Sequence, residues 1–190
     1  KIPALDTALV ENTQNVGEWM IFDSLGAGQF SVVKRCRKKE IHGGDDKEYA
    51  IKMICKDKYR TVDSIFRAEN EIKALTALGD HPNILTAEDV LHGKIGLYIV
   101  TELMPMDLFD FTEKYKYHLN DNLVGYMMGL LLSGLDHLWK HDVVHRDLKP
   151  ENVLADFSGG DLRIKICDFG LCTPFRQGDT LRDFCGSPGF

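Results

Sequence analysis

The sequence His145-Arg146-Asp147-Leu148-Lys149-Pro150-Glu151-Asn152 places two acids, two cations and an amide within eight residues, between apolar stretches. Such a loop is a poor element of a hydrophobic core, because each buried charge would need a partner. Sixteen residues after Asn152 the chain reads Asp168-Phe169-Gly170, following a strand-like run at 162–166. An amide oxygen and a carboxylate that converge on one point suit Mg²⁺, which can also hold phosphates. The two segments therefore predict a phosphate site with Asn152 and Asp168 as metal ligands.

A glycine turn near the start of the chain, Gly26-Ala27-Gly28-Gln29-Phe30, separates two runs at 19–25 and 31–36 that have strand composition. Backbone N–H groups can approach a phosphate closely at glycine, since no Cβ intervenes. A Rossmann site would need a helix after the turn and a third glycine, where this chain has a strand and Ser31. A dinucleotide-binding oxidoreductase is therefore disfavoured, and an ordinary glycine hairpin is the alternative when the turn is considered alone.

A lysine interrupts the apolar strand predicted at 48–54, in the sequence Tyr49-Ala50-Ile51-Lys52-Met53-Ile54. An unpaired ammonium group is costly there, so Lys52 should have a carboxylate partner unless it is an ordinary solvated lysine. Glu71, nineteen positions later on the helix predicted to follow, is the favoured partner. Glu69 lies on another face of that helix and is less favoured.

The composition is that of a globular protein, with 190 residues, 44% of them hydrophobic and 27% charged. A net charge of −6 lacks the basic footprint expected of a nucleic-acid-binding protein. No apolar run approaches the ~20 residues of a membrane span, so we expect a soluble intracellular protein with no membrane partner. The five cysteines form no C-x-x-C pair, which favours reduced thiols over a disulfide framework or a zinc site.

The order of predicted elements divides the chain into three parts: an extension at 1–17, a β-rich lobe at 18–103 and a helical part at 104–190. Further strands are predicted at about 85–91 and 97–103, and helices at 61–78, 108–116 and 122–140. The apolar face of the first helix is predicted from its spacing as Val62, Ile65, Ile72, Leu75 and Leu78. Three glycines of the last helix are expected to permit close packing, namely Gly125, Gly129 and Gly134.

Taken together, these motifs resemble those of the eukaryotic protein kinases. Gly26-x-Gly28-x-Phe30-x-x-Val33 is similar to the glycine-rich loop and Ala50-Ile51-Lys52 to the V-A-I-K strand, while 145–152 and 168–170 resemble the catalytic loop and the D-F-G motif. The resemblance covers residues 19–190 and implies an α+β, bilobal kinase fold. The sequence Lys149-Pro150-Glu151-Asn152 resembles the form of the catalytic loop that serine/threonine kinases have. The sequences at 30–36 and 186–190 resemble those of the calcium/calmodulin-dependent kinase group most.

The resemblance implies a role for each matching residue in transfer of the γ-phosphate of ATP to Ser or Thr hydroxyls. Lys52, held by Glu71, would bind the α- and β-phosphates; Asp147 would accept the substrate proton and Lys149 would steady the γ-phosphate. Asn152 and Asp168 would hold the Mg²⁺ ions. The residues expected to contact ATP are Gly26, Gly28, Val33, Ala50, Lys52, Thr101 as gatekeeper, Glu102 and Met104 at the hinge, Asp107 and Leu154.

Some positions depart from the kinase pattern or leave an alternative open. Ala87 is small where a larger apolar residue commonly completes a stack with Leu75, Phe169 and His145. The chain stops at Phe190, before an A-P-E motif, so we expect a piece of a longer protein and inefficient phosphorylation by these 190 residues alone. A non-catalytic nucleotide-binding pseudokinase or scaffold module is the alternative function.

The resemblance also implies partners and a means of regulation. Protein substrates with basic residues N-terminal to the phosphorylated Ser or Thr are expected, because Asp107 and Glu151 fall where related kinases bind substrate arginines. Calmodulin, or another regulator that binds outside these residues, is a candidate partner, and the expected location is cytoplasmic or nuclear. Asp183 is a candidate built-in substitute for a regulatory phosphate near Arg146. Ser187 is expected to steady Asp147 and Lys149.

Overall fold

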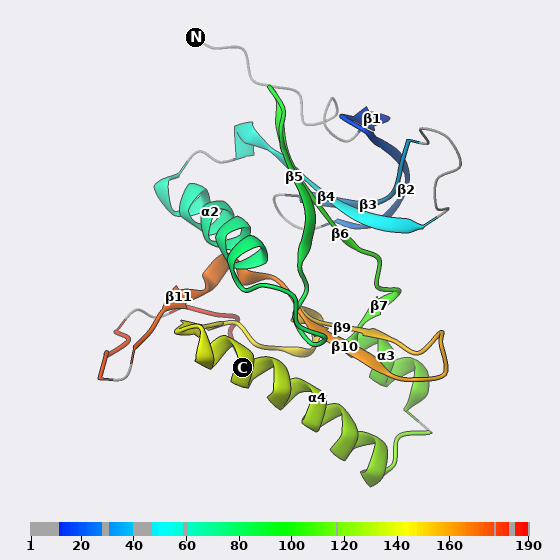
Figure 1. Cartoon of the computed structure of the whole chain (residues 1–190), viewed down its shortest axis with the longest axis vertical. Coiled ribbons are helices and arrows are strands. Elements are labelled where there is room, and N and C mark those ends of the chain that lie inside the picture. The colour runs from blue at the N-terminus through cyan, green and yellow to red at the C-terminus, as the bar shows by residue number, and fades with distance from the viewer. Residues whose placement is uncertain are drawn as a thin grey trace. The chain divides into compact units, whose positions relative to one another are not determined.

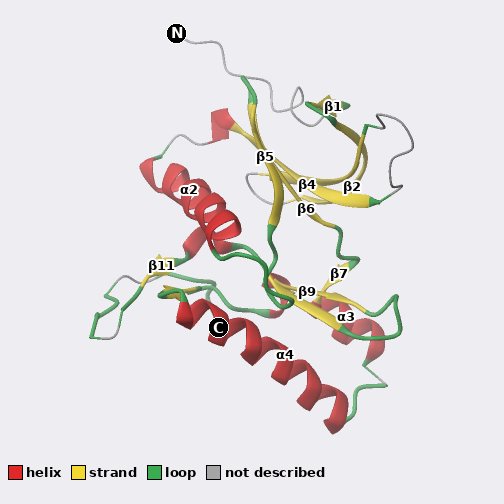
Figure 2. Cartoon of the chain, viewed as in Figure 1, coloured by secondary structure: helices red, strands yellow, loops and turns green. Residues whose placement is uncertain are grey.

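The computed structural model describes residues 12–27, 31–39, 47–58, 61–116, 118–176, 178–182 and 185–189. These residues form two compact units. The first contains the described residues up to Phe66 together with Ala87–Leu103, and the second contains Arg67–Thr86 and the described residues from Met104 onward. Each unit has its own hydrophobic core. Figures 1 and 2 show the helices and strands by label and by type. The predicted limits of the extension and the two lobes stay predictions.

The first unit is built on a six-stranded sheet with the order β1-β2-β3-β4-β6-β5, in which all neighbours are antiparallel. Its strands are β1 Asn15–Val16, β2 Trp19–Ala27, β3 Ser31–Lys38, β4 Glu48–Cys55, β5 Ala87–His92 and β6 Gly96–Glu102. Asn15 and Val16, which lie within the extension predicted at 1–17, pair with β2.

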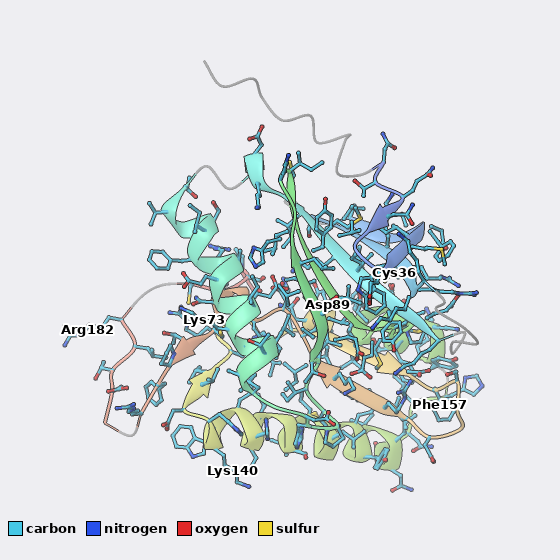
Figure 3. All side chains as sticks on the ribbon, turned by 45° about the horizontal axis from the view of Figure 1, so that its top comes forward. Cys36, Lys73, Asp89, Lys140, Phe157 and Arg182 are labelled. Carbon is cyan, nitrogen blue, oxygen red and sulfur yellow. The ribbon has the colours of Figure 1, made fainter. Side chains whose placement is uncertain are left out.

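Burial of apolar side chains on one side of this sheet stabilises the pairing of its strands. Its buried core comprises Trp19, Ile21, Cys36, Ile51, Met53, Cys55, Tyr98 and Val100. The indole N–H of Trp19 donates to the carboxylate of Asp89 at 2.8 Å, which ties β2 to β5 (Asp89 is labelled in Figure 3). Burial raises the pKa of the Cys36 thiol to about 12, and all five cysteines of the chain are free.

A short 3-10 turn, η1 Lys56–Lys58, and helix α2 Val62–Ala77 follow the third long strand of the sheet. The Thr61 hydroxyl accepts a hydrogen bond from the Ser64 N–H at 3.2 Å, which satisfies a free donor of the first turn. The predicted apolar face is correct only toward the end of the helix, where Leu75 and Leu78 are buried. Val62 and Ile65 are exposed, so their part of that prediction is wrong.

The second unit combines helices with two small sheets, ordered β10-β9-β7 and β11-β8. Its helices are α3 Leu108–Tyr115 and α4 Asp121–Lys140, and its short 3-10 turns are η2 Pro150–Asn152 and η3 Phe169–Leu171. Its strands are β7 Met106–Asp107, β8 Val143–Val144, β9 Val153–Asp156, β10 Arg163–Ile166 and β11 Thr173–Pro174. The core is formed by Phe111, Met127, Val153, Ala155, Leu162 and Ile164. Both predicted helices are thus confirmed.

Helix α4 runs along the β9–β10 hairpin, as Figure 1 shows, and contacts it through a narrow face. A Cβ on Gly134 would lie 2.9 Å from the backbone oxygen of Asn83 and from a methyl group of Ile166, so this glycine permits a close approach. A Cβ on Gly125 or Gly129 would meet nothing within 4 Å, so the packing predicted for these two is wrong. Among the described residues, no helix has the length and apolarity needed to cross a membrane.

The segment between α2 and β5 also belongs largely to the second unit. The side-chain amide of Asn83 donates to the carbonyl oxygen of Ile164 at 3.0 Å, and Ile84 forms a parallel bridge with Ile166. The N–H of Leu85 donates to the Ile166 carbonyl oxygen at 2.9 Å. The strand predicted at 85–91 therefore begins later, at Ala87, because Leu85 is already bound in the other unit.

Candidate active site

The segment that connects β8 to β9 carries two of the four predicted catalytic residues, Asp147 and Lys149, and the predicted metal ligand Asn152. It leaves β8 at Val144, passes through Arg146 with φ at 66°, and ends in the turn η2, where Pro150 occupies a first-turn position. Proline suits that position because its missing N–H would have had no helical partner. Asn152, at the end of the turn, is buried, and this fixes the side chain under the loop.

Asp147 lies at the centre of a network of short hydrogen bonds. The amide nitrogen of Asn152 donates to the backbone oxygen of Asp147 at 2.8 Å and to its Oδ2 at 3.0 Å. The N–H of Ser187 donates to Oδ1 at 2.7 Å, and the ammonium of Lys149 donates to the Ser187 hydroxyl at 2.6 Å. The expectation that Ser187 steadies both Asp147 and Lys149 is thereby confirmed. The amide of Asn152 and the N–H of Ser187 thus hold the two carboxylate oxygens of Asp147 in a fixed orientation.

These contacts also set the charge of Asp147. Burial raises the pKa of its carboxyl, but the hydroxyl and N–H of Ser187, the charge of Lys149 and the amide of Asn152 together hold the pKa below its ordinary 3.8. The Lys149 ammonium lies 3.7 Å from Oδ2. Asp147 is therefore a carboxylate at neutral pH, able to accept a hydrogen bond from a hydroxyl group.

His145 joins this loop to the segment that contains Asp168. Its Nδ1 accepts a hydrogen bond from the Asp147 N–H at 3.2 Å, so Nε2 carries the proton that is donated to the Cys167 carbonyl oxygen at 2.9 Å. Burial lowers the pKa of the imidazole, outweighing the Cys167 hydrogen bond and the nearby carboxylates of Asp168 and Asp147. A neutral histidine thus connects the two loops.

Asp168 follows directly and has a left-handed backbone, with φ at 61° and ψ at 70°. The Cys167 N–H donates to the backbone oxygen of Asn152 at 3.0 Å, which brings the segments before Asp168 and after Asp147 together. The ring of Phe169 is fully buried and packs edge-on against His145, with ring centroids 5.3 Å apart. The carboxylate of Asp168 is left exposed to solvent.

The donor set of Asn152 and Asp168 fits a magnesium ion. Because the amide nitrogen of Asn152 donates twice to Asp147, the amide oxygen is the group that can serve as a ligand. Together with the exposed carboxylate of Asp168, it provides hard oxygen ligands from two adjoining segments. Mg²⁺ commonly takes few protein ligands and completes its shell with phosphates and water, so a pair of side chains is sufficient.

The predicted residues on the first unit lie in register on adjacent strands. Val33 of β3 pairs with Lys52 of β4, and Ala50 of β4 pairs with Thr101 of β6. Lys52 is half-buried within the sheet. The Thr101 hydroxyl donates to the backbone oxygen of Glu102 at 3.3 Å.

Gly26, the first glycine of the turn, is exposed in β2 with no atom within 4 Å of an added Cβ, whereas Gly28 lies outside the described residues. Lys52 belongs to the first unit and Glu71 to the second, and their pairing stays a prediction.

Three more predicted residues lie on the second unit with the catalytic loop. Asp107 of β7 pairs with Leu154 of β9, and Met104 is buried just before β7. Asp107 also has a structural role, since its Oδ1 accepts the N–H of Asp110 at 2.8 Å and caps α3. Aspartate before a helix is a common cap, and that signal was present in the sequence.

Arg146, the residue expected to meet a regulatory phosphate or its substitute, contacts the segment after Phe169. Its Nε donates to the backbone oxygen of Leu171 at 2.7 Å, which links the catalytic loop to the segment after Phe169. Asp183, the candidate substitute for a phosphate, lies outside the described residues. Asn70, which no sequence motif singles out, also binds this segment, because its side-chain amide donates to the Cys172 carbonyl oxygen at 3.2 Å.

Comparison with known proteins agrees with this geometry. The family described as protein kinase domain matches residues 19–190, and the chain therefore belongs to it. The predicted α+β kinase fold with a β-rich N-lobe is confirmed.

Three curated relatives are also similar to the chain. It is 36% identical over 163 residues to human ribosomal protein S6 kinase alpha-2, a match that covers 85% of this chain and 21% of that protein. It is 32% identical over 181 residues to sucrose non-fermenting protein kinase 1 of Fusarium virguliforme, covering 95% and 25%. It is 35% identical over 178 residues to serine/threonine-protein kinase SIK1 of Rattus norvegicus, covering 92% and 21%. The chain thus spans a quarter or less of these relatives.

Proposed function

We propose that this protein transfers the γ-phosphate of ATP to Ser or Thr hydroxyls of protein substrates, with Mg²⁺ as cofactor. The observation that carries the proposal is the network around Asp147, in which Asn152, Ser187 and Lys149 fix an ionised carboxylate. Similarity to serine/threonine protein kinases supports the same reaction.

In the proposed reaction Asp147 accepts the proton of the substrate hydroxyl as the hydroxyl oxygen attacks the γ-phosphorus of ATP. The bond from that phosphorus to the β-phosphate oxygen breaks, and ADP leaves. Lys149, held by Ser187 at 2.6 Å, presents its ammonium group to the transferring phosphoryl group. Asn152 and Asp168 would hold the metal through their side-chain oxygens. Bound Mg²⁺ would neutralise phosphate charge. The protein contributes position and charge rather than covalent chemistry.

The first unit is proposed to supply the remaining contacts with ATP. Lys52 would bind the α- and β-phosphates and take Glu71 as its partner. Val33 and Ala50 would pack on the adenine with Leu154, and the backbone at Glu102 and Met104 would hydrogen-bond its edge. The antiparallel register that pairs Val33 with Lys52 supports the assignment, because adjacent positions on neighbouring strands place both on one face of the sheet.

We further propose membership of the calcium/calmodulin-dependent group and a preference for basic residues N-terminal to the phosphorylated site. Asp107 and Glu151 are the candidate partners for substrate arginines, since carboxylates pair with guanidinium groups in a bidentate geometry. One oxygen of Asp107 caps α3, which leaves the other for an arginine or for the ATP ribose. Calmodulin remains a candidate regulator, and a cytoplasmic or nuclear location is proposed.

A non-catalytic nucleotide-binding module is the second candidate, and the small side chain of Ala87 favours it. A weakened stack would shift a kinase toward inactive conformations. Phosphate transfer to a basic peptide separates the two candidates, because a non-catalytic module would bind ATP in a thermal-shift titration without transferring phosphate.

The experiment that tests the proposal compares Lys52→Met and Asp168→Ala with the wild type in the complete protein. Each substitution should lower the rate of phosphate transfer by about 10²-fold or more, as expected for the loss of one preorganised charge at the reacting group. Circular dichroism should show that both variants stay folded. Glu113→Gln, on the exposed surface of α3, is the matched control and should keep the wild-type rate. Turnover like that of the wild type in either site variant would contradict the assignment.

A further inference from the structure

Helix α2 and the segment after Asp168 are connected through a pair of side chains in the second unit. The amide nitrogen of Asn70 donates to the backbone oxygen of Cys172 at 3.2 Å, and the Cys172 thiol lies 3.9 Å from the backbone oxygen of Asn70. The side chain of each residue thus faces the backbone oxygen of the other. Asn70 directly precedes Glu71, and Cys172 comes four residues after Asp168.

The thiol is in the protonated state that this contact needs. Cys172 is buried, and burial raises the pKa of its thiol above the usual 9.0. The positive charge of Arg146 acts against this rise and the negative charge of Glu71 adds to it, which places the sulfur within the electrostatic range of both. A neutral S–H group can donate to the Asn70 carbonyl oxygen, whereas a thiolate could not.

The residues on either side of the pair are also in contact with their neighbours. A Cβ on Gly170 would lie 3.7 Å from the Cβ and the backbone oxygen of Arg67, one turn before Asn70. On the other side, Arg146 binds the Leu171 carbonyl oxygen at 2.7 Å. Thr173 then pairs with Val144 of β8. The segment 169–173 is therefore held by α2 on one side and by the catalytic loop on the other.

We propose that Asn70 is a positioning residue, which couples the helix of Glu71 to the loop of the metal ligand Asp168 through its contact with Cys172. The left-handed backbone of Asp168 is unfavourable for a residue with a Cβ, so the surrounding contacts must hold it in place. Asn70 contributes to this by fixing the chain four residues later. This inference rests on the proposed function, because its consequence is the orientation of a ligand for Mg²⁺.

Asn70→Ala should therefore loosen the segment after Asp168 in the complete protein. Hydrogen exchange of the amides at 169–173 should become about five-fold faster, the factor that corresponds to one hydrogen bond of ordinary strength. The Mg²⁺ concentration for half-maximal activity should rise by about the same factor, with a smaller change in kcat. Glu69→Ala is the matched control, since Glu69 lies on the same helix and pairs only with Lys73 in the contacts described (Lys73 is labelled in Figure 3). It should change neither quantity.

A second variant covers the case in which Asn70→Ala fails to fold. Asn70→Asp keeps the shape of the side chain but replaces the donor by an oxygen that faces the Cys172 carbonyl, so it should reproduce the faster exchange. Exchange that is unchanged in Asn70→Asp, or that rises equally in Glu69→Ala, would overturn the inference. Hydrogen exchange needs no catalysis, so it tests the coupling separately from the proposed function. Faster exchange in the Asn70 variants, together with a wild-type protein that transfers no phosphate, would retain the coupling and remove the proposed function.

Discussion

Helix α4 and the catalytic loop that follows it are held in place by different forces. The helix contacts its neighbours through a narrow apolar face that includes Met127, Gly134 and Leu138, and its other faces are open to solvent. The loop at 145–152 has few apolar contacts and is held by hydrogen bonds between side chains and backbone, most of them at Asp147. The fit of side chains positions the helix, whereas the geometry of hydrogen bonds positions the loop. Substitutions in the helix should therefore affect stability, and substitutions in the loop should affect activity.

Gly134 and Gly129 offer the strongest test of the helix. Gly134→Ala should lower the free energy of unfolding by about 1–3 kcal/mol, because the new Cβ would clash with Asn83 and Ile166. Gly129→Ala should raise it by up to about 1 kcal/mol, because alanine favours the helix and the space beside Gly129 is open. Urea denaturation of both variants measures the difference. Equal effects of the same sign would contradict the described packing of α4.

Ser187 tests the loop. Ser187→Ala removes the acceptor of the Lys149 ammonium and should lower kcat by about ten-fold, with little change in the free energy of unfolding. Ser187→Thr keeps the hydroxyl and should retain most of the activity. The measurement is steady-state kinetics of both variants with one peptide substrate. Full activity of Ser187→Ala would show that this hydrogen bond does not position Lys149.

Substitution of His81 tests the contact between the α2–β5 segment and α4. We expect it to have the smallest effect of these substitutions. His81 stacks on His137 with ring centroids 4.4 Å apart. Burial, the charge of His137 and that of Lys165 lower the pKa of His81, against the opposite effect of Asp136 and Asp80.

A pKa below 6.5 in the folded state means that the unfolded chain binds the proton first, so stability is lost as pH falls below 6.5. His81→Gln should lose less stability than the wild type between pH 7 and 5.5, as measured by urea denaturation at each pH. Parallel curves for the two proteins would contradict this role.

Much of the fold could be predicted because its signals are local. Runs of strand composition located the strands of the first sheet except β1, and the sequence pattern located α3 and α4 within a residue or so of their observed ends. The ordered motifs predicted Asp147, Asn152 and Asp168 as site residues because the resemblance to protein kinases implies roles at these positions, and the roles stay predictions. Ser187 could be placed for the same reason.

The remaining features depend on contacts between distant residues. The spacing of Val62 and Ile65 is that of a buried face, but whether a partner covers it is decided elsewhere in the chain. Gly125, Gly129 and Gly134 are alike in sequence, and only Gly134 faces the Asn83 backbone. The contact of Asn70 with Cys172 spans 102 positions and has no local signal.

The central claim is that Asp147 acts as the proton acceptor in phosphate transfer to a protein hydroxyl. The most direct measurement is transfer of labelled phosphate from Mg²⁺–ATP to a basic peptide with a single serine, by the complete wild-type protein and by Asp147→Asn. Asparagine keeps the size of the side chain but cannot accept the proton, so the rate should fall by about 10²–10⁴-fold while the variant stays folded. Equal rates for the two proteins, or no transfer by the wild type, would contradict the account.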